Sequence, residues 1–183
     1  LVAIVFKIIL PHTSSLLVIN FIFVSMDTAT VRQLKTELNG LDRNELIEIV
    51  LRLSKFKKEN KELLTYLLFE SDDEQDYIKE IKIEIDEAFE KINPNSYFYI
   101  KKSIRKILKS IKTYIRYSNV RETEVELLLY FCKKLRIMSP SMTRNQQLIN
   151  IFSREIKNIE KKIKTLHEDL QHDYFHLLEN LKS

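Results

Sequence analysis

Apolar side chains recur at intervals of three and four residues along most of the chain after residue 26. This spacing gathers them on one face of an α-helix, whereas a half-buried strand would alternate apolar and polar positions. The first such stretch contains Val31, Leu34 and Leu38. A second runs to Phe56, and residues 63–69 form a third, or continue the second with a bend. The pattern predicts an all-α protein.

Capping signals mark several of the predicted helix ends. Gly40 follows the first helix as a C′ residue, where the left-handed conformation costs a glycine little. Asp42 with Glu45 has the spacing of a capping box at the start of the second helix. Ser71 with Glu74 has the same spacing before a later helix.

The central part of the chain predicts three further helices. Isoleucines and Phe89 line one face of a helix that stops at Asn93-Pro94-Asn95, because proline disfavours helical geometry in the residue before it. A basic helix follows over residues 97–117. Residues 125–138 are apolar nearly all round, and a helix without a polar face is a buried one. We therefore expect this helix at the centre of the core.

Residues 141–183 contain neither glycine nor proline. Their apolar residues follow a heptad-like pattern with a single stutter. This predicts one long C-terminal helix, or two nearly collinear ones. The expected fold is all-α, with residues 26–183 forming a single compact domain of six to seven helices and a long C-terminal helix.

Residues 1–25 differ from the rest of the chain, because they are strongly apolar and carry one charge, Lys7. Neither apolar half reaches the roughly 20 residues of a membrane span, and the segment fits a signal peptide poorly. We interpret it as an over-extended translation, with Met26 as the true start. A signal or anchor, or a genuine folded element, are the alternatives.

Composition excludes several classes of site. One glycine cannot build a glycine-rich phosphate loop, and one cysteine cannot build a disulfide framework or a cysteine-clustered zinc site. The net charge of +4 is mild for a nucleic-acid binder. No spacing of residues matches a known catalytic constellation, and Cys132 lies within the apolar helix, where we expect it to be buried and inert.

The basic helix is the sharpest candidate site. It has seven cations and no acid, a pattern that suits phosphate binding, with tyrosines nearby that could stack on bases. The competing interpretation is that some of this charge faces the acidic helix before it, since the Pro94 turn would fold the two helices antiparallel. The candidate nucleic-acid-binding residues are Lys101, Lys102, Arg105, Lys106, Lys109, Lys112 and Arg116.

A weaker candidate is a metal site near the C-terminus. Glu168, His172 and His176 are spaced by four residues and share one helical face. Helical metal bundles need such ligands on separate helices, and the other helices lack them. We therefore favour an exposed polar face.

Several stretches together resemble an uncharacterised all-helical bacterial protein family, a domain of unknown function, over about residues 26–174. They are ELIEIVLRL, KENKELLTYLLFESDDEQDYI, YFYIKKSIRKILKSIKTYIRYS, ETEVELLLYFCKKL and LHEDLQHDY. The resemblance implies a bacterial cytoplasmic helical protein and implies no activity, ligand or catalytic residue.

The functional prediction is a non-enzymatic helical interaction or scaffold protein without a cofactor. We expect a protein partner, or self-association through the C-terminal helix, and no membrane contact unless residues 1–25 are a real anchor. Nucleic-acid binding through the basic helix is the alternative, and a metal-dependent helical enzyme is a third possibility. The expected location is the cytoplasm.

Overall fold

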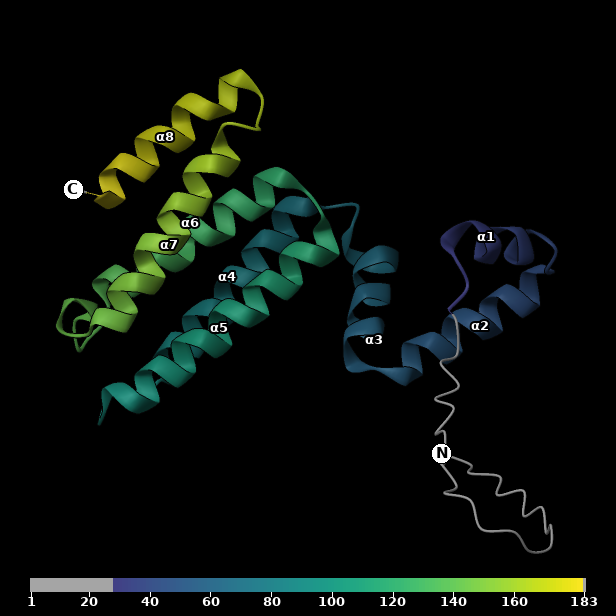
Figure 1. The fold of residues 1–183 in the computed structure, drawn as a ribbon, viewed down its shortest axis with the longest axis horizontal. Coiled ribbons are helices and arrows are strands. Elements are labelled where there is room, and N and C mark those ends of the chain that lie inside the picture. The colour runs from purple at the N-terminus through teal and green to yellow at the C-terminus, as the bar shows by residue number, and fades with distance from the viewer. Residues whose placement is uncertain (1–27, 183) are drawn as a thin grey trace, which may run out of the picture. The chain divides into compact units, whose positions relative to one another are not determined.

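The computed structural model describes residues 28–182, and in this range every regular element is helical. The prediction of an all-α protein is confirmed. Two short irregular helical turns complete the described elements: the π-helical turn η1, Tyr66–Glu70, and the 3₁₀ turn η2, Met142–Arg144. The α-helices (Figure 1) are α1 Val31–Asn39, α2 Arg43–Phe56, α3 Lys58–Thr65, α4 Glu74–Glu90, α5 Tyr97–Ser118, α6 Arg121–Ile137, α7 Gln146–Ile163 and α8 Glu168–Lys182.

The capping box at the start of α2 is confirmed. The Glu45 amide donates to Asp42 Oδ1 at 2.9 Å, and the Asp42 amide donates to Glu45 Oε2 at 2.9 Å. The predicted Ser71–Glu74 cap is wrong, because the chain turns through η1 and α4 begins later, with Asp73 accepting the Asp76 amide at 2.9 Å.

The conformation expected for Gly40 is also wrong. Its φ of −85° is right-handed, and its amide closes α1 by donating to the carbonyls of the preceding turn. Among the described non-glycine residues, a left-handed backbone occurs at Asn119, where φ is 56° and the amide donates to the Ile115 carbonyl at the end of α5.

The chain divides between Leu46 and Ile47 into two compact units. The first contains α1 and the beginning of α2, and the second contains the rest of α2 and all later elements. A single compact domain of six to seven helices is thus not confirmed. The predicted role of residues 1–25 lies outside the described residues.

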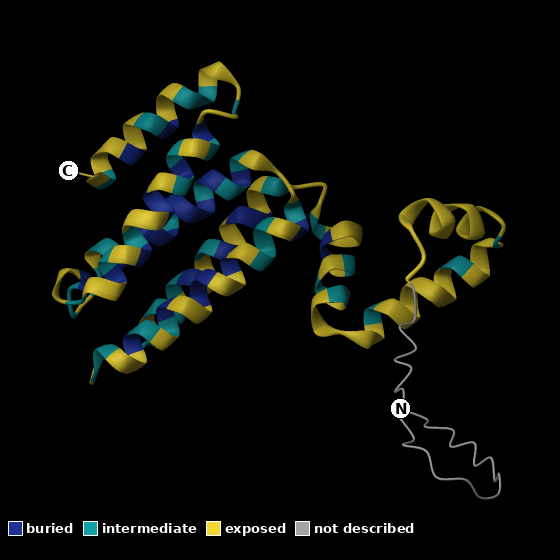
Figure 2. Cartoon of the chain, viewed as in Figure 1, coloured by how far each residue is buried: buried dark blue, intermediate teal, exposed yellow. Residues whose placement is uncertain are grey.

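Helix α6 is the centre of the larger unit, as its sequence predicts. It packs against α4, α5, α7 and α8. Val125, Leu128, Phe131 and Cys132 are all fully buried, and Figure 2 shows the buried colour in the middle of the larger unit. The largely apolar character of α6 is explained, because packing against four helices leaves little of its surface for a polar face.

The long C-terminal helix is a wrong prediction, since the chain breaks between α7 and α8. The Thr165 and Leu166 amides donate to the Lys162 and Ile163 carbonyls, each at 2.9 Å, and form a turn. Helix α8 then folds back over α6 and α7 and buries Tyr174 and Leu178 (Figure 1). Folding back brings these side chains onto the core, which heptad spacing alone does not distinguish from a straight continuation.

Across residues 28–182, no helix combines the length and the apolar character that a bilayer crossing requires.

Candidate functional site

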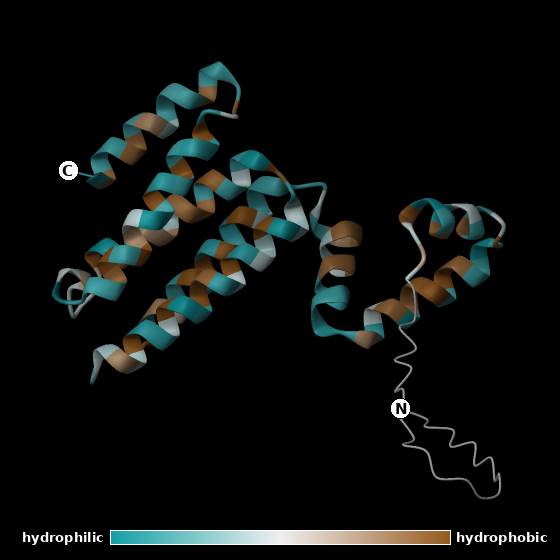
Figure 3. Ribbon diagram, in the orientation of Figure 1, coloured by the Kyte–Doolittle hydropathy of each residue, from teal (hydrophilic) through white to brown (hydrophobic). Residues whose placement is uncertain are grey.

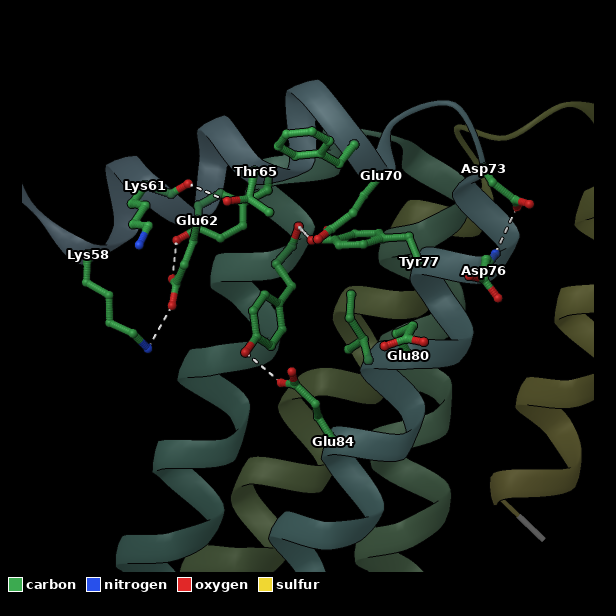
Figure 4. Close-up of a pocket in the computed structure, with 14 residues that line it drawn as sticks. Lys58, Lys61, Glu62, Thr65, Glu70, Asp73, Asp76, Tyr77, Glu80 and Glu84 are labelled. Atoms are coloured by element: carbon green, nitrogen blue, oxygen red, sulfur yellow. Dashed lines mark hydrogen bonds and ion pairs between the residues drawn. The ribbon is translucent and has the colours of Figure 1, made fainter. Parts of the chain in front are cut away.

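A cavity of about 530 Å³ lies between α3 with η1, α4 and α5, and all of it belongs to the larger unit. Figure 4 shows its lining residues, in which carboxylates outnumber lysines six to two. The remaining wall contains tyrosines and Phe69. The acidic residues are Glu62, Glu70, Asp73, Asp76, Glu80 and Glu84, and the lysines are Lys58 and Lys61.

Tyrosine hydroxyls hold the cavity wall together across three elements. Tyr117 of α5 donates to Glu62 Oε2 of α3 at 2.9 Å, and Tyr114 donates to Glu84 Oε2 of α4 at 2.7 Å. Tyr77 donates to the Tyr114 carbonyl at 3.1 Å. Burial and the neighbouring carboxylate raise the pKa of both Tyr114 and Tyr117 far above the ordinary value, so these phenols stay protonated as donors.

A buried polar cluster fixes the end of α5 and the start of α6 beside the cavity. Glu74 accepts the Tyr66 hydroxyl at 2.8 Å and also the hydroxyls of Ser118 and Thr123. Thr123 is completely buried. The N-terminus of α4 is anchored in this way against two other helices, so that its carboxylates face the cavity from a fixed backbone.

Four of the six carboxylates at the cavity have no cationic partner among the described residues. Glu70, Asp73, Glu80 and Glu84 form no ion pair there, whereas Lys58 Nζ pairs with Glu62 Oε1 at 2.7 Å. Burial raises the pKa of Glu70 above its usual value, and the charges of Glu80 and Glu84 add to the effect. This end of the cavity therefore concentrates negative charge.

The structure divides the cations of the basic helix into two sets. Lys112 Nζ lies 2.9 Å from Oε2 of Glu155 on α7, and the Glu155 side chain is only 1% exposed. Arg105 donates to Gln147 Oε1 of α7 at 3.0 Å, and Arg116 donates to Thr113 Oγ1 at 3.4 Å. Lys112 and Arg105 are thus part of the α5–α7 contact.

The other set contains Lys102, Lys106 and Lys109, which are exposed and make no ion pair with any described residue. Lys101, one residue before this set, is partly buried and also makes none in that range. Lys106 and Lys109 line a cleft of about 270 Å³ between α3 and α5, and its other charged lining residues are Lys58, Glu59 and Glu62 of α3.

The expected ion pairs between the acidic and the basic helix are not found in residues 28–182. Asp86 of α4 instead pairs with Lys134 of α6, with Nζ 2.9 Å from Oδ1, and accepts the Tyr130 hydroxyl. Burial opposes ionisation of Asp86, but these two hydrogen bonds hold its pKa below the usual value. Helix α4 packs against both α5 and α6, so its acidic side chains can pair with lysines of either helix.

The candidate metal ligands Glu168, His172 and His176 all lie exposed on α8. Among the residues that the structure describes, no group of three histidine, cysteine, aspartate or glutamate side chains is arranged to hold a metal ion. A metal site at this face stays the weaker hypothesis, and an exposed polar face stays the favoured one.

Cys132 is buried, as its position in α6 predicts. Burial is the main reason that the pKa of its thiol rises to about 12, and the negative charge of Glu155 contributes. A nucleophilic cysteine needs the opposite environment, exposed and close to positive charge.

A further candidate is a set of exposed apolar side chains that the sequence pattern assigned to helix packing. No residue of α1, α2 or α3 is buried. Figure 3 shows apolar residues on α2 where Figure 2 shows exposure. Periodicity predicts an apolar face but does not say whether the chain itself covers it. We name the α2 surface as Ile47, Ile49, Val50, Leu51, Leu53 and Phe56, all of which are exposed.

Comparisons of the chain with protein-family models, with curated proteins and with solved structures find no match. The resemblance to a bacterial helical family therefore stays a prediction.

Proposed function

We propose that this protein is a non-enzymatic interaction or scaffold protein that binds another polypeptide through the α2 surface. The observation that carries the proposal is the exposure of this surface, where Leu53 is 56% and Phe56 is 76% exposed. Single exposed apolar residues are ordinary on proteins, but contiguous apolar patches mark interaction sites. Six such side chains on one 14-residue helix form a patch of that kind.

The arrangement of the α2 surface suits a helical partner. Ile47, Val50 and Leu53 follow one another at three-residue steps along the helix, with Leu51 and Ile49 on either side. Such a stripe packs ridges into grooves against the apolar face of another helix. The charged residues Glu48, Arg52 and Lys55 lie on the opposite face of α2, where they stay in water.

A short helix also needs such a partner for its own stability. Isolated helices shorter than about 12–15 residues are marginal in water, and most helix stability in proteins comes from packing an apolar face. We include in the proposal a bacterial cytoplasmic location and the action of residues 26–183 as one functional unit.

Nucleic-acid binding is the second candidate, and one observation favours it. Lys102, Lys106 and Lys109 are exposed without ion pairs in the described range. Binding through phosphates must weaken steeply as salt rises, because each contact releases counterions. Replacing these three lysines with glutamine would abolish such binding to RNA or DNA oligonucleotides, whereas replacing Lys157, Lys161 and Lys164 of the α7 end would spare it.

Photo-crosslinking in cells tests the leading proposal. A photoreactive amino acid is placed at Leu53 or Phe56 on the α2 surface, or at Glu48 or Lys55 on the opposite face as matched controls. We expect the same foreign protein to be crosslinked from both apolar positions and from neither control. The substitution Leu53→Asp should remove the Phe56 crosslink without lowering Tm.

Three results would overturn the proposal. They are equal crosslinking from both faces, crosslinks confined to other residues of the same chain, and no crosslink at any of the four positions.

A further inference from the structure

The π-helical turn η1 carries three consecutive large apolar side chains on the surface of the larger unit. Leu67, Leu68 and Phe69 are each more than half exposed. Tyr66 at the start of the turn is buried, and its carbonyl accepts the Ser71 amide at 2.9 Å. Three exposed apolar residues in a row do not serve a core, and such a run is typical of a binding surface. We name Leu67, Leu68 and Phe69 the η1 surface.

The η1 surface is continuous with the acidic cavity, because Phe69 belongs to both. The next residue, Glu70, is partly buried and enters the cavity from η1, while Glu80 and Glu84 enter it from α4 (Figure 4). A molecule that covers the η1 surface therefore meets the carboxylates of the cavity at the same time.

The cavity holds more unpaired negative charge than unpaired positive charge. Within residues 28–182, four of its carboxylates form no ion pair, and Lys61 is the one lining lysine without an ion pair. The side chains of Glu70 and Glu80 also accept no hydrogen bond in this range. Burial raises the pKa of Glu70, and the charges of Glu80 and Glu84 add to the effect. A cation placed between these carboxylates would relieve that repulsion.

Aromatic side chains complete the wall of the cavity. Tyr77, Tyr114 and Tyr117 line it together with Phe69, and the Tyr114 and Tyr117 rings lie 6.2 Å apart. Aromatic faces attract cations, and a guanidinium group can stack on such a ring while it binds a carboxylate. The volume of about 530 Å³ lies within the usual range of ligand sites. The cavity therefore suits a cationic group on an apolar stem.

We propose that the acidic cavity and the η1 surface together bind a short basic segment of a partner polypeptide. An arginine or lysine of the segment enters the cavity between Glu70 and Glu80. An apolar side chain next to this cation packs on Leu68 and Phe69. The unpaired carboxylates thus specify the charge of the molecule that covers the η1 surface, and the η1 surface specifies its apolar part.

Other occupants match only one part of this site. A nucleic acid would be repelled by the unpaired carboxylates. A purely apolar helix would cover the η1 surface but take water away from carboxylates that have no other partner, which is costly. A small polyamine would neutralise the carboxylates and leave the η1 surface exposed. The site uses no residue of the α2 surface, so the proposal does not rest on the function proposed above.

The lysines beside the cavity limit where the basic segment lies. The cavity and the cleft between α3 and α5 share Lys58, Glu62 and Tyr114, and Lys106 and Lys109 line that cleft. These lysines repel a second cation, so the cationic part of the segment is confined to the side of η1 and α4. Replacing Lys106 and Lys109 with glutamine should therefore not weaken binding.

Phage display of random peptides of about 12 residues on the purified full chain tests the proposal. We expect the enriched peptides to share an arginine or lysine with apolar neighbours. A synthetic copy of the most enriched peptide is then titrated by fluorescence anisotropy, and its binding should weaken as salt rises. Leu53→Asp on the α2 surface should leave this binding unchanged, which separates the two surfaces.

One pair of variants tests the carboxylates. Glu70→Gln with Glu80→Gln removes two unpaired charges and no hydrogen bond among the described residues. This double variant should weaken binding of the peptide by about 10-fold or more without lowering Tm. Glu90→Gln with Glu168→Gln makes the same change in net charge at exposed positions elsewhere and should bind like the wild type.

A second pair of variants tests the η1 surface. Leu68→Ala with Phe69→Ala should also weaken binding by about 10-fold or more, because it removes the apolar contact. Phe98→Ala with Ile137→Ala truncates two comparably exposed side chains elsewhere and should have no effect.

Five results would overturn the proposal. They are the enrichment of no peptide, enriched peptides without a cationic residue, and a Glu70→Gln, Glu80→Gln variant that binds like the wild type. A fourth is full binding by the Leu68→Ala, Phe69→Ala variant with displacement by spermidine, which would assign the cavity to small polyamines. The fifth is self-association of the chain that Glu70→Gln with Glu80→Gln abolishes, which would assign the site to a second copy.

Discussion

Helices α2 and α6 both carry many large apolar side chains, yet α6 is buried in the structure and α2 is exposed. α6 buries its leucines and Phe131 among four neighbouring helices. α2 has a comparable number of large apolar side chains and buries none of them. The difference shows that an apolar face allows a helix to pack. Only the tertiary structure decides whether that face packs against the same chain or against another molecule.

The largest effect expected from this comparison comes from truncating a matched pair of phenylalanines. Phe131 is completely buried and Phe69 is 80% exposed. Phe131→Ala should lower the free energy of unfolding by about 3–5 kcal/mol because it leaves a cavity. Phe69→Ala should change it by less than about 0.5 kcal/mol. Urea denaturation of the two variants measures both values, and equal losses would mean that Phe69 is packed in solution.

A second pair of variants separates the two sets of lysines on α5. Lys112→Met removes the partner of the buried Glu155 carboxylate and should cost about 2–3 kcal/mol, below the usual cost of breaking a buried pair because Arg154 still contacts Glu155. Lys106→Met removes an exposed lysine and should cost less than about 0.5 kcal/mol. Thermal denaturation at several salt concentrations checks this order. A larger loss for Lys106→Met would contradict the division of the helix into two sets.

A smaller effect is expected at Glu70 in the acidic cavity, and it depends on pH. The pKa of Glu70 is raised in the folded state, so folding favours its protonated form. The stability contributed by this group is therefore lost as pH rises from the unfolded value through the folded one. Glu70→Gln should raise Tm by about 1–2 °C at pH 7 and have no effect near pH 3.5. The exposed Glu90, changed to glutamine, is the control, and a lower Tm for Glu70→Gln at pH 7 would be the contrary result.

The smallest effect is expected at the polar face of α8. A metal that binds the folded state must stabilise it by linkage. Stoichiometric zinc or iron should leave Tm unchanged for the wild type and for His172→Ala alike. A thermal shift that His172→Ala abolishes would instead establish Glu168, His172 and His176 as metal ligands.

Sequence periodicity was sufficient for the features that depend on local spacing. It predicted the all-α class, the central position of the apolar helix that begins before residue 125, the burial of Cys132, and the break at Pro94. Within residues 125–138 the burial ends at Leu135, because Ile137 is 67% exposed. It did not predict the fold-back of α8, because heptad spacing continues through 164–167 and only the bundle decides where a helix turns. The predicted Ser71 cap is wrong for a related reason, since the π-helical turn that precedes Ser71 has no sequence signal comparable to a capping box.

For the candidate sites, the sequence predicts which residue types are present but not how their side chains are arranged in space. The sequence identifies the basic helix. Whether Lys112 pairs with Glu155, and whether Lys106 lacks an ion pair among the described residues, depends on which helices lie beside α5. The acidic cavity gathers side chains from α3, η1, α4 and α5, and its lining extends from Lys58 to Tyr117 in the sequence. No local pattern joins them, although the density of acids in residues 70–87 was visible as a charge run.

Amide hydrogen exchange of the purified full chain shows whether the α2 surface is uncovered in solution, because it measures how well each helix is supported by packing. We expect the amides of α2 to exchange faster than those of α6 by a factor of about 1,000 or more, since no buried side chain of α2 opposes its opening. Equal protection of the two helices would be the contrary result, because it would mean that the α2 surface is already covered and is not available to a partner.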